Sequence, residues 1–190
     1  GVPKGWIMEL LCLAEDLKTG LSDVDEQHAS LFEWGNRVLF PEGGKLQPRE
    51  VVEILGLLTG YVKYHFSAEE KAMERSDFPG LRQHKALHNK IMDELNVVQK
   101  DCAGGSFSRK QQARLHFLMS DWLTYHIGSA DKVFASFARE QGIADDVELE
   151  GMGGFTVAGF TNADLARVSV VQPTGQVPRS EAAARARRYR

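Results

Sequence analysis

The chain contains a series of long segments compatible with helices, separated by short breaks that contain proline or glycine. Before Gly151, no stretch shows the alternation of apolar and polar residues that is typical of a strand. The interruptions end one helix and let the chain reverse before the next. They are Pro41–Gly44, Phe78–Gly80 and Gly104–Gly105, and the predicted helices run from Ser22 to Phe40, from Pro48 to about Arg75, from the residue after Gly80 to about Asp101, and from a cap at Ser106 or Ser108 to Glu140.

The ends and lengths of these segments predict how they pack. Ser22 suits a helix N-cap, and the acids that follow it suit the first turn, where free N–H groups attract negative charge. Pro48 suits the first position of the second helix. Four helices of roughly 20 to 30 residues with short connections predict an all-α, antiparallel up-down four-helix bundle. We expect residues 1–20 to form an N-terminal arm and residues 21–141 to form the bundle.

The character of the sequence changes after Gln141. Five glycines lie between positions 142 and 159, and the segments 155–158 and 168–170 have the composition of short strands. The last twelve residues contain five arginines and a single acid, Glu181. We expect residues 142–190 to be an irregular extension. It is either a loosely docked tail or a segment that docks a protein partner or targets the chain.

The cysteines, the longest apolar stretch near the start and the net charge indicate which compartment and which partners to expect for this chain. Cys12 and Cys102 lie far apart and without CxxC spacing, which fits a reducing compartment better than a disulfide-stapled secreted domain. The apolar stretch at 6–13 contains Glu9, is too short to span a bilayer and lacks the flanks of a signal peptide. A formal net charge of −3 indicates neither a nucleic acid nor an anionic membrane as partner. We expect a cytoplasmic protein without membrane insertion.

Five of the six histidines form a pattern with two acids. His65 and Glu69 are four residues apart, and so are His84 and His88, so each pair lies on one face of its helix. A single pair of this kind is weak evidence, because helical histidines are more often surface residues than ligands. A contribution from every helix, in order, points to a shared site. The predicted metal ligands are His28 on the first helix, His65 and Glu69 on the second, His84 and His88 on the third, and His126 and Asp131 on the fourth.

One spacing conflicts with a regular helix. Asp131 follows His126 by five residues, which is a rotation of about 140° in an α-helix, so both side chains would not point inward. We expect a π-type bulge, a local bend or a reaching Asp131 side chain here, and Gly128 eases such a distortion.

The number and type of donors indicate the metal. Five imidazoles and two carboxylates suit iron and exceed the four positions of a single Zn²⁺. If two non-haem irons share both carboxylates and one oxo or hydroxo bridge, three histidines complete six positions on one iron. Two histidines leave the other iron with five ligands and one open position. Ferritin-like di-iron oxidases use four carboxylates, so this histidine-rich shell favours reversible binding of O₂ over its activation.

Four segments, at 20–28, 65–70, 78–88 and 122–132, resemble the hemerythrin family, specifically its bacterial members. The resemblance covers roughly residues 15–140 and fills all seven ligand positions. It implies an O₂-binding di-iron bundle and not an enzyme. It further implies that His84, His88 and His126 bind the six-coordinate iron, that His28 and His65 bind the O₂-binding iron, that Glu69 and Asp131 bridge them, and that Phe66, Trp122, Leu123 and Ile127 form an apolar O₂ pocket, although core packing would also explain these last four.

Several features depart from the family or leave its role open. The loop between the first two helices is longer than is typical, Trp6 lies earlier than the tryptophan of the bacterial arm, and the extension has no counterpart in single-domain members. The chain could therefore be an O₂ carrier, store or delivery protein, an O₂ or redox sensor that signals through its extension, or an enzyme that handles peroxide, nitric oxide or iron. His116 is rotated about 80° from His126 and is expected to miss the site.

Overall fold

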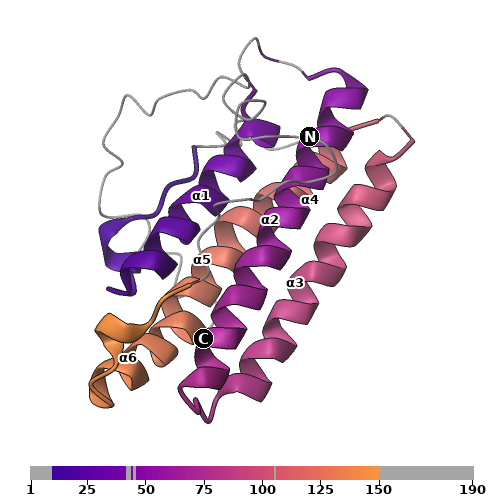
Figure 1. Ribbon diagram of the computed structural model, residues 1–190. Coiled ribbons are helices and arrows are strands. Elements are labelled where there is room, and N and C mark those ends of the chain that lie inside the picture. Colours follow the sequence, from indigo (N-terminus) through magenta and orange to yellow (C-terminus); the bar gives the residue numbers. More distant parts are fainter. Residues whose placement is uncertain (1–9, 42–43, 45, 105, 150–190) are drawn as a thin grey trace, which may run out of the picture.

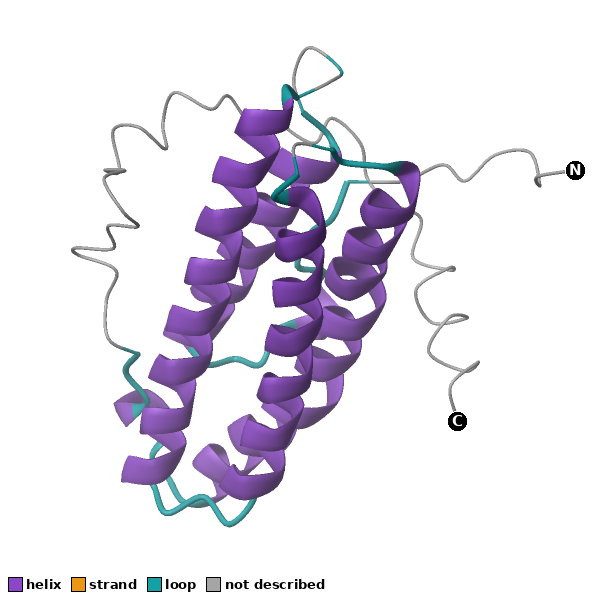
Figure 2. Ribbon diagram, turned by 90° about the vertical axis from the view of Figure 1, so that its right-hand side faces the viewer, coloured by secondary structure: helices purple, strands orange, loops and turns teal. Residues whose placement is uncertain are grey.

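The computed structural model describes residues 10–41, 44, 46–104 and 106–149, and within this part every regular element is a helix (Figures 1 and 2). Four long helical stretches lie side by side, and successive ones run in opposite directions. The predicted all-α, up-down four-helix bundle is confirmed. Its first three helices are α1 (Ser22–Leu39), α2 (Pro48–Arg75) and α3 (Leu81–Cys102), and its fourth is a continuous run of α4 (Arg109–Phe117), η2 (Leu118–Trp122), α5 (Leu123–His126), η3 (Ile127–Asp131) and α6 (Lys132–Glu140), in which η2 and η3 are π-helical.

Two helix starts follow directly from local sequence. Pro48 occupies the first position of α2, where the N–H that proline lacks would have no helical partner. The Glu50 carboxylate accepts a hydrogen bond from the Gln47 N–H at 2.6 Å and so satisfies one of the free donors of that end. Ser108, one of the two serines predicted as a cap, accepts a hydrogen bond from the Gln111 N–H. Both ends therefore use the chemistry expected of helix N-termini.

The start of α1 differs from the prediction that Ser22 caps it. Ser22 is the first helical residue, and Leu21 occupies the N-cap position without a side-chain hydrogen bond. Asp25 instead accepts hydrogen bonds from the Thr19 N–H and hydroxyl, at 2.7 and 2.8 Å, and from the Gly20 N–H at 2.9 Å. Gly20 has a φ of 81°, which residues with side chains rarely adopt. A first-turn carboxylate thus fixes the tight turn that leads into the helix.

The interior consists of two apolar clusters. α1 packs against α2 and α4, and α3 packs against α2 and α4, so each helix contributes one face to the interior. The larger cluster includes Leu31, Leu58, Tyr61 and Leu115. The smaller cluster, nearer the loop between α2 and α3, includes Leu21, Val24, Met73, Phe78 and Phe134. Along every helix, the predicted ligand positions lie between residues of the larger cluster and residues of the smaller one.

The described part of the arm, residues 10–20, packs along the bundle. It contains one turn of 3₁₀ helix, η1 (Glu15–Leu17). The Asn36 amide on α1 donates to the Leu11 carbonyl at 2.7 Å and accepts from the Leu11 N–H at 2.8 Å. Arg139 on α6 donates to the Thr19 carbonyl at 2.7 Å. These bonds tie the arm to the first and last helices of the bundle.

The first residues of the extension also pack on the bundle. After the short 3₁₀ helix η4 (Ala144–Asp146), Leu149 is buried in the smaller apolar cluster. Arg75 at the end of α2 donates to the Glu148 carbonyl at 2.8 Å, and Asp23 on α1 accepts from the Leu149 N–H at 3.1 Å. The predicted strands at 155–158 and 168–170 and the basic end lie outside the described residues. Among the helices that are described, none has the length and apolar character to cross a membrane.

Candidate metal centre

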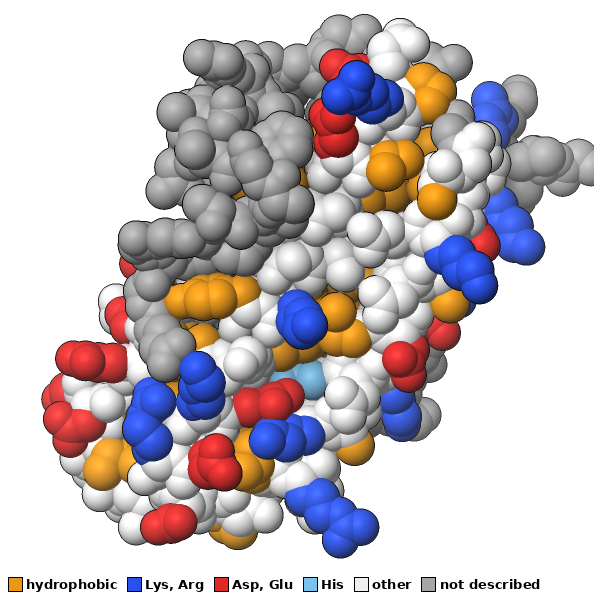
Figure 3. All heavy atoms as spheres, turned by 45° about the vertical axis from the view of Figure 1, so that its right-hand side comes forward, with side chains coloured by type: hydrophobic (Ala, Val, Ile, Leu, Met, Phe, Trp, Pro, Cys, Tyr) orange, Lys and Arg blue, Asp and Glu red, His pale blue; other side chains and the backbone are white. Residues whose placement is uncertain are grey.

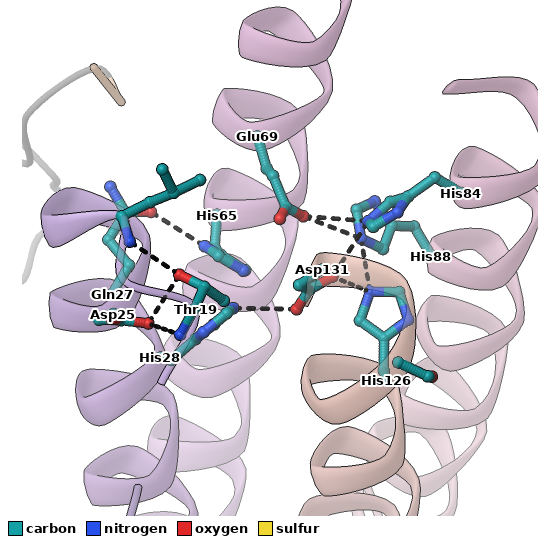
Figure 4. A network of polar contacts seen from close by, with 12 residues as sticks. Thr19, Asp25, Gln27, His28, His65, Glu69, His84, His88, His126 and Asp131 are labelled. Atoms are coloured by element: carbon teal, nitrogen blue, oxygen red, sulfur yellow. Dashed lines mark hydrogen bonds and ion pairs between the residues drawn. The ribbon is translucent and has the colours of Figure 1, made fainter. Parts of the chain in front are cut away.

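The seven predicted ligands lie together between the two apolar clusters. Every one of them is buried, and the most exposed, His84, is only 3% exposed. Figure 4 shows their side chains pointing toward one another from all four helices. The set is His28 on α1, His65 and Glu69 on α2, His84 and His88 on α3, His126 at the end of α5 and Asp131 at the end of η3.

In three of the histidines, the Nε2 atom of the ring points to the same small region. The Nε2 atoms of His88 and His126 are 3.1 Å apart. The Nε2 of His84 lies 3.1 Å from Glu69 Oε2 and 3.3 Å from Asp131 Oδ1, and these donor atoms all lie within 4.8 Å of one another. Two ligands at right angles on one metal, with bonds of about 2.1 Å, are separated by about 3.0 Å. The spacing is therefore that of ligands to a common cation.

The other two histidines lie on the far side of Asp131. Asp131 directs Oδ2 to His28 Nε2 at 3.1 Å, whereas its Oδ1 lies 2.9 Å from His126 Nε2. His65 stands beside His28, with ring centroids 4.9 Å apart. The two oxygens of one carboxylate thus face two groups of histidines. This division is what a carboxylate that bridges two metals requires.

Several polar atoms of the centre lack hydrogen-bond partners among the described residues. His65 Nε2 and Glu69 Oε1 are buried without one, and neither oxygen of Asp131 is aligned for a hydrogen bond with the histidines near it. Buried lone pairs that face one another are unfavourable, because neither water nor a donor satisfies them. A cation bound between them would satisfy several at once. The donor set of imidazoles and carboxylates therefore fits a transition-metal ion such as iron.

The π-helical segment η3 explains how both ligands of the fourth helix face inward. It runs from Ile127 to Asp131, directly after His126. Bonding from residue i to i+5 widens the turn, so the residue five positions on returns to the same face of the helix. The predicted π-type distortion is confirmed. A second π segment, η2, was not predicted, because no spacing conflict reveals it in the sequence.

Two residues that were not predicted contact the outer nitrogen of a ligand histidine, which is the ring nitrogen Nδ1 that faces away from the centre. Gln27 Oε1 lies 3.0 Å from His65 Nδ1, and Glu70 Oε1 lies 2.8 Å from His88 Nδ1. Lys85 approaches Glu70 at 3.6 Å. Such contacts fix the orientation and tautomer of a ligand histidine. Gln27 precedes His28 and Glu70 follows Glu69, so adjacency to a predicted ligand is the signal that could have indicated them.

Burial and mutual charge shift the pKa values of the centre in opposite directions. Burial and the neighbouring His28 lower the pKa of His65 to about 3, so its ring is neutral. Burial also disfavours a charged His84, but the carboxylates of Asp131 and Glu69 outweigh it and raise its pKa to about 9. In return, His126 and the other histidines hold the pKa of Asp131 well below its usual range, despite burial. Despite burial and the neighbouring Asp131, hydrogen bonds from His84 and His88 lower the pKa of Glu69 as well, so both carboxylates are ionised.

Of the predicted O₂-pocket residues, two aromatic rings touch the centre. Phe66 stacks on His88 with ring centroids 3.7 Å apart, and Trp122 stacks on His126 at 5.0 Å. Leu123 and Ile127 are buried in the larger apolar cluster. The role of these four residues as an O₂ pocket stays a prediction. His116 lies outside the centre, with its Nδ1 3.2 Å from the Ser120 hydroxyl.

Comparison with known proteins agrees with this arrangement. A family model described as the hemerythrin HHE cation binding domain matches residues 19–138. The chain belongs to the hemerythrin family. The matched region contains the whole bundle up to α6 and all seven buried ligands of the candidate centre. In this hemerythrin domain, side chains from all four helical stretches meet in the metal-binding cluster.

Three curated relatives of this hemerythrin domain carry the name Bacteriohemerythrin. The chain is 28% identical to Bacteriohemerythrin of Methylococcus capsulatus over 121 residues, which are 64% of this chain and 90% of that protein. It is 27% identical to Bacteriohemerythrin of Stenotrophomonas maltophilia over 141 residues, 70% of this chain and 90% of that protein. It is 26% identical to Bacteriohemerythrin of Pseudomonas aeruginosa over 148 residues, 78% of this chain and 94% of that protein. No solved structure gave a significant match.

Proposed function

We propose that this chain binds O₂ reversibly at a non-haem di-iron centre and serves as an oxygen carrier, store or delivery protein. The observation that carries the proposal is the division of the donors around Asp131. Its Oδ1 faces the group of His84 and His126, and its Oδ2 faces His28. One side thus has three histidines and the other has two. The two-histidine side has one protein ligand fewer, so a metal bound there would keep one coordination position for a small exogenous ligand.

The residues would divide the binding of two irons as follows. His84, His88 and His126 would hold one iron, His28 and His65 the other, and Glu69 and Asp131 would bridge them. When bound, the irons supply the electrons that reversible O₂ binding takes up and returns. The chain supplies seven buried donors, and the rings of Phe66 and Trp122 stack on two of the histidines among them. Reversible binding consumes no substrate, so the proposed role is not enzymatic.

The test is iron analysis combined with ultraviolet–visible spectra of the anaerobically reduced protein before and after O₂. We expect about two irons per chain and an absorption band that appears with O₂, disappears under argon and returns through repeated cycles. Binding of a single zinc and no iron would overturn the proposal. Rapid steady turnover of nitric oxide or peroxide would show an enzyme instead. O₂-dependent association with a larger complex would show a sensor.

A pair of matched variants checks that the centre is the one described. His65→Ala removes one of the two histidines on the two-histidine side and is expected to lose iron and the O₂-dependent band. His116→Ala removes a histidine that lies outside the centre and is expected to keep both. Equal iron content in the two variants would show that the donors assigned here do not hold the metal.

A further inference from the structure

The two sides of the metal centre differ in what holds the outer nitrogen of a ligand histidine. On the three-histidine side, His88 Nδ1 lies 2.8 Å from a carboxylate oxygen of Glu70. On the two-histidine side, His65 Nδ1 lies 3.0 Å from the amide oxygen of Gln27. The Nε2 of His88 is among the donors of the centre, and that of His65 has no hydrogen-bond partner among the described residues. The partner of His88 Nδ1 is therefore an anion, whereas the partner of His65 Nδ1 is a neutral amide.

The partner of His88 is a charged group supported from the surface. The Glu70 side chain is 21% exposed and lies 3.6 Å from Lys85 Nζ. The same carboxylate lines the groove between α2 and α3 with Phe66 and His88, and Figure 3 shows histidine surface on this face beside acidic and basic side chains. Partial exposure and a neighbouring cation keep the carboxylate ionised. His88 therefore donates its Nδ1 proton to an anion.

The partner of His65 is neutral and buried. Gln27 is 7% exposed, and its backbone carbonyl accepts a hydrogen bond from the Tyr61 hydroxyl at 3.4 Å. If His65 binds a metal through Nε2, its proton must be on Nδ1, so the atom of Gln27 that faces it must be the acceptor oxygen. An amide oxygen attracts that proton less strongly than a carboxylate does. Gln27 thus holds His65 in the tautomer that can bind a metal through Nε2. It strengthens this ring as a metal donor less than Glu70 strengthens His88.

A carboxylate that accepts the outer proton of a ligand histidine makes the ring a stronger donor to its metal. A stronger donor stabilises the more highly charged metal ion. We propose that Glu70 and Gln27 are positioning residues that make the two metal positions electronically unequal. Glu70 strengthens the donor on the three-histidine side, and Gln27 keeps the donor weaker on the side with room for an exogenous ligand. This inference rests on the proposed di-iron function.

The test uses reciprocal substitutions in the full chain loaded anaerobically with iron. Glu70→Gln gives His88 a neutral partner, and Gln27→Glu gives His65 an anionic one. We expect the midpoint potential of the ferric/ferrous couple to rise in Glu70→Gln and to fall in Gln27→Glu. The affinity for ferric iron, measured by competition with a chelator, is expected to fall about tenfold in Glu70→Gln, the lower end of the range for such partners. Potentials unchanged in both variants, or shifted in the same direction, would overturn the proposal.

Three further variants separate this effect from structural damage. Glu74→Gln, an exposed glutamate one turn along α2, makes the same chemical change away from the centre and is expected to keep the wild-type potential. Glu70→Asp retains the negative charge and is expected to restore part of the shift. If Gln27→Glu does not fold, Gln27→Leu removes the acceptor without adding charge and is expected to raise the potential. A Gln27→Leu potential equal to that of wild type would then contradict the assignment.

The inference and the proposed function fail in different ways. If wild-type protein holds two irons but does not bind O₂ reversibly, the proposed function is wrong. The midpoint potentials of Glu70→Gln and Gln27→Glu then still test whether the two metal positions are electronically unequal. If wild-type protein binds O₂ reversibly and neither variant moves the potential, the inference falls alone. If wild-type protein does not take up a pair of irons, both fall together.

Discussion

Asp131 Oδ1 lies 2.9 Å from the Nε2 of His126, five residues earlier on the same helix. The π-helical turn η3, Ile127–Asp131, returns the chain to the inner face after five residues instead of four. The second oxygen of Asp131 lies 3.1 Å from His28 on α1. The irregular turn therefore aligns one carboxylate with a donor on its own helix and with a donor on α1.

Replacement of Asp131 by Asn is expected to disrupt the pairing of the metals. The amide has nearly the same shape but only one oxygen, and its NH₂ group cannot bind a cation. We expect iron to fall from about two per chain to about one or fewer. Asp121→Asn, on the neighbouring π segment, alters an acid that accepts a hydrogen bond from Ser120 and is expected to keep full iron. Iron analysis after anaerobic loading decides, and full iron in Asp131→Asn would refute the bridging role.

The ligand positions could be predicted because metal binding restricts both residue type and spacing. His65 with Glu69, and His84 with His88, each repeat after one helical turn, and an α-helix turns this spacing into a shared face. The five-residue spacing of His126 and Asp131 predicted a π-type bulge, a local bend or a reaching Asp131 side chain, and the structure shows the first of these. A metal site whose ligands must have a fixed spacing along a helix can therefore be predicted from a single sequence.

Other features depend on packing between segments and were not predicted. The roles of Gln27 and Glu70 depend on which ring nitrogen of a histidine on another helix faces them. The η2 segment leaves no conflicting spacing behind. Leu149 lies in a stretch that reads as irregular, and its burial follows from contacts with α1 and α2, which are distant in the sequence. Sequence reasoning predicted side chains that the structure places together, but it did not predict the contacts that hold and surround them.

Tyr61 gives the fold a dependence on alkaline pH. Burial raises its pKa to about 12 from 10.0, so the neutral phenol stabilises the folded state fully below pH 10, and this contribution is lost as the pH rises from 10 to about 12. A shift of about two units corresponds to about 3 kcal/mol. Tyr61→Phe should therefore lose stability less steeply in this window, whereas Tyr125→Phe, at an exposed residue, should follow wild type. Urea unfolding of the metal-free proteins tests this, and parallel curves for all three would contradict it.

Leu149 is expected to contribute to the stability of the bundle although it follows the last long helix. Its side chain is 5% exposed and packs in the smaller apolar cluster with residues of three helices. Leu149→Ala should lower the free energy of unfolding by about 2 kcal/mol, at the low end for buried leucines because a segment end can relax into the cavity. Val133→Ala, at a residue that is 60% exposed, should change it by less than about 0.5 kcal/mol. Equal midpoints in urea would show that residues 143–149 do not stabilise the domain.

Metal uptake is expected to release a proton from His84 and to strengthen as the pH rises. Burial opposes its charge, but Asp131 and Glu69 raise the pKa of His84 to about 9, so the metal-free ring is protonated at neutral pH. A metal binds only the deprotonated Nε2, so below pH 9 each binding event displaces this proton. The pKa of His88 is also raised, by hydrogen bonds to Glu69 and Glu70 that outweigh burial. The logarithm of the apparent Co²⁺ affinity should therefore rise by at least about one per pH unit between about pH 6.5 and about pH 8.5. Calorimetry in two buffers of different ionisation enthalpy measures the released protons directly. An affinity that is constant across this range, with no proton released, would show that His84 is already neutral in the metal-free protein.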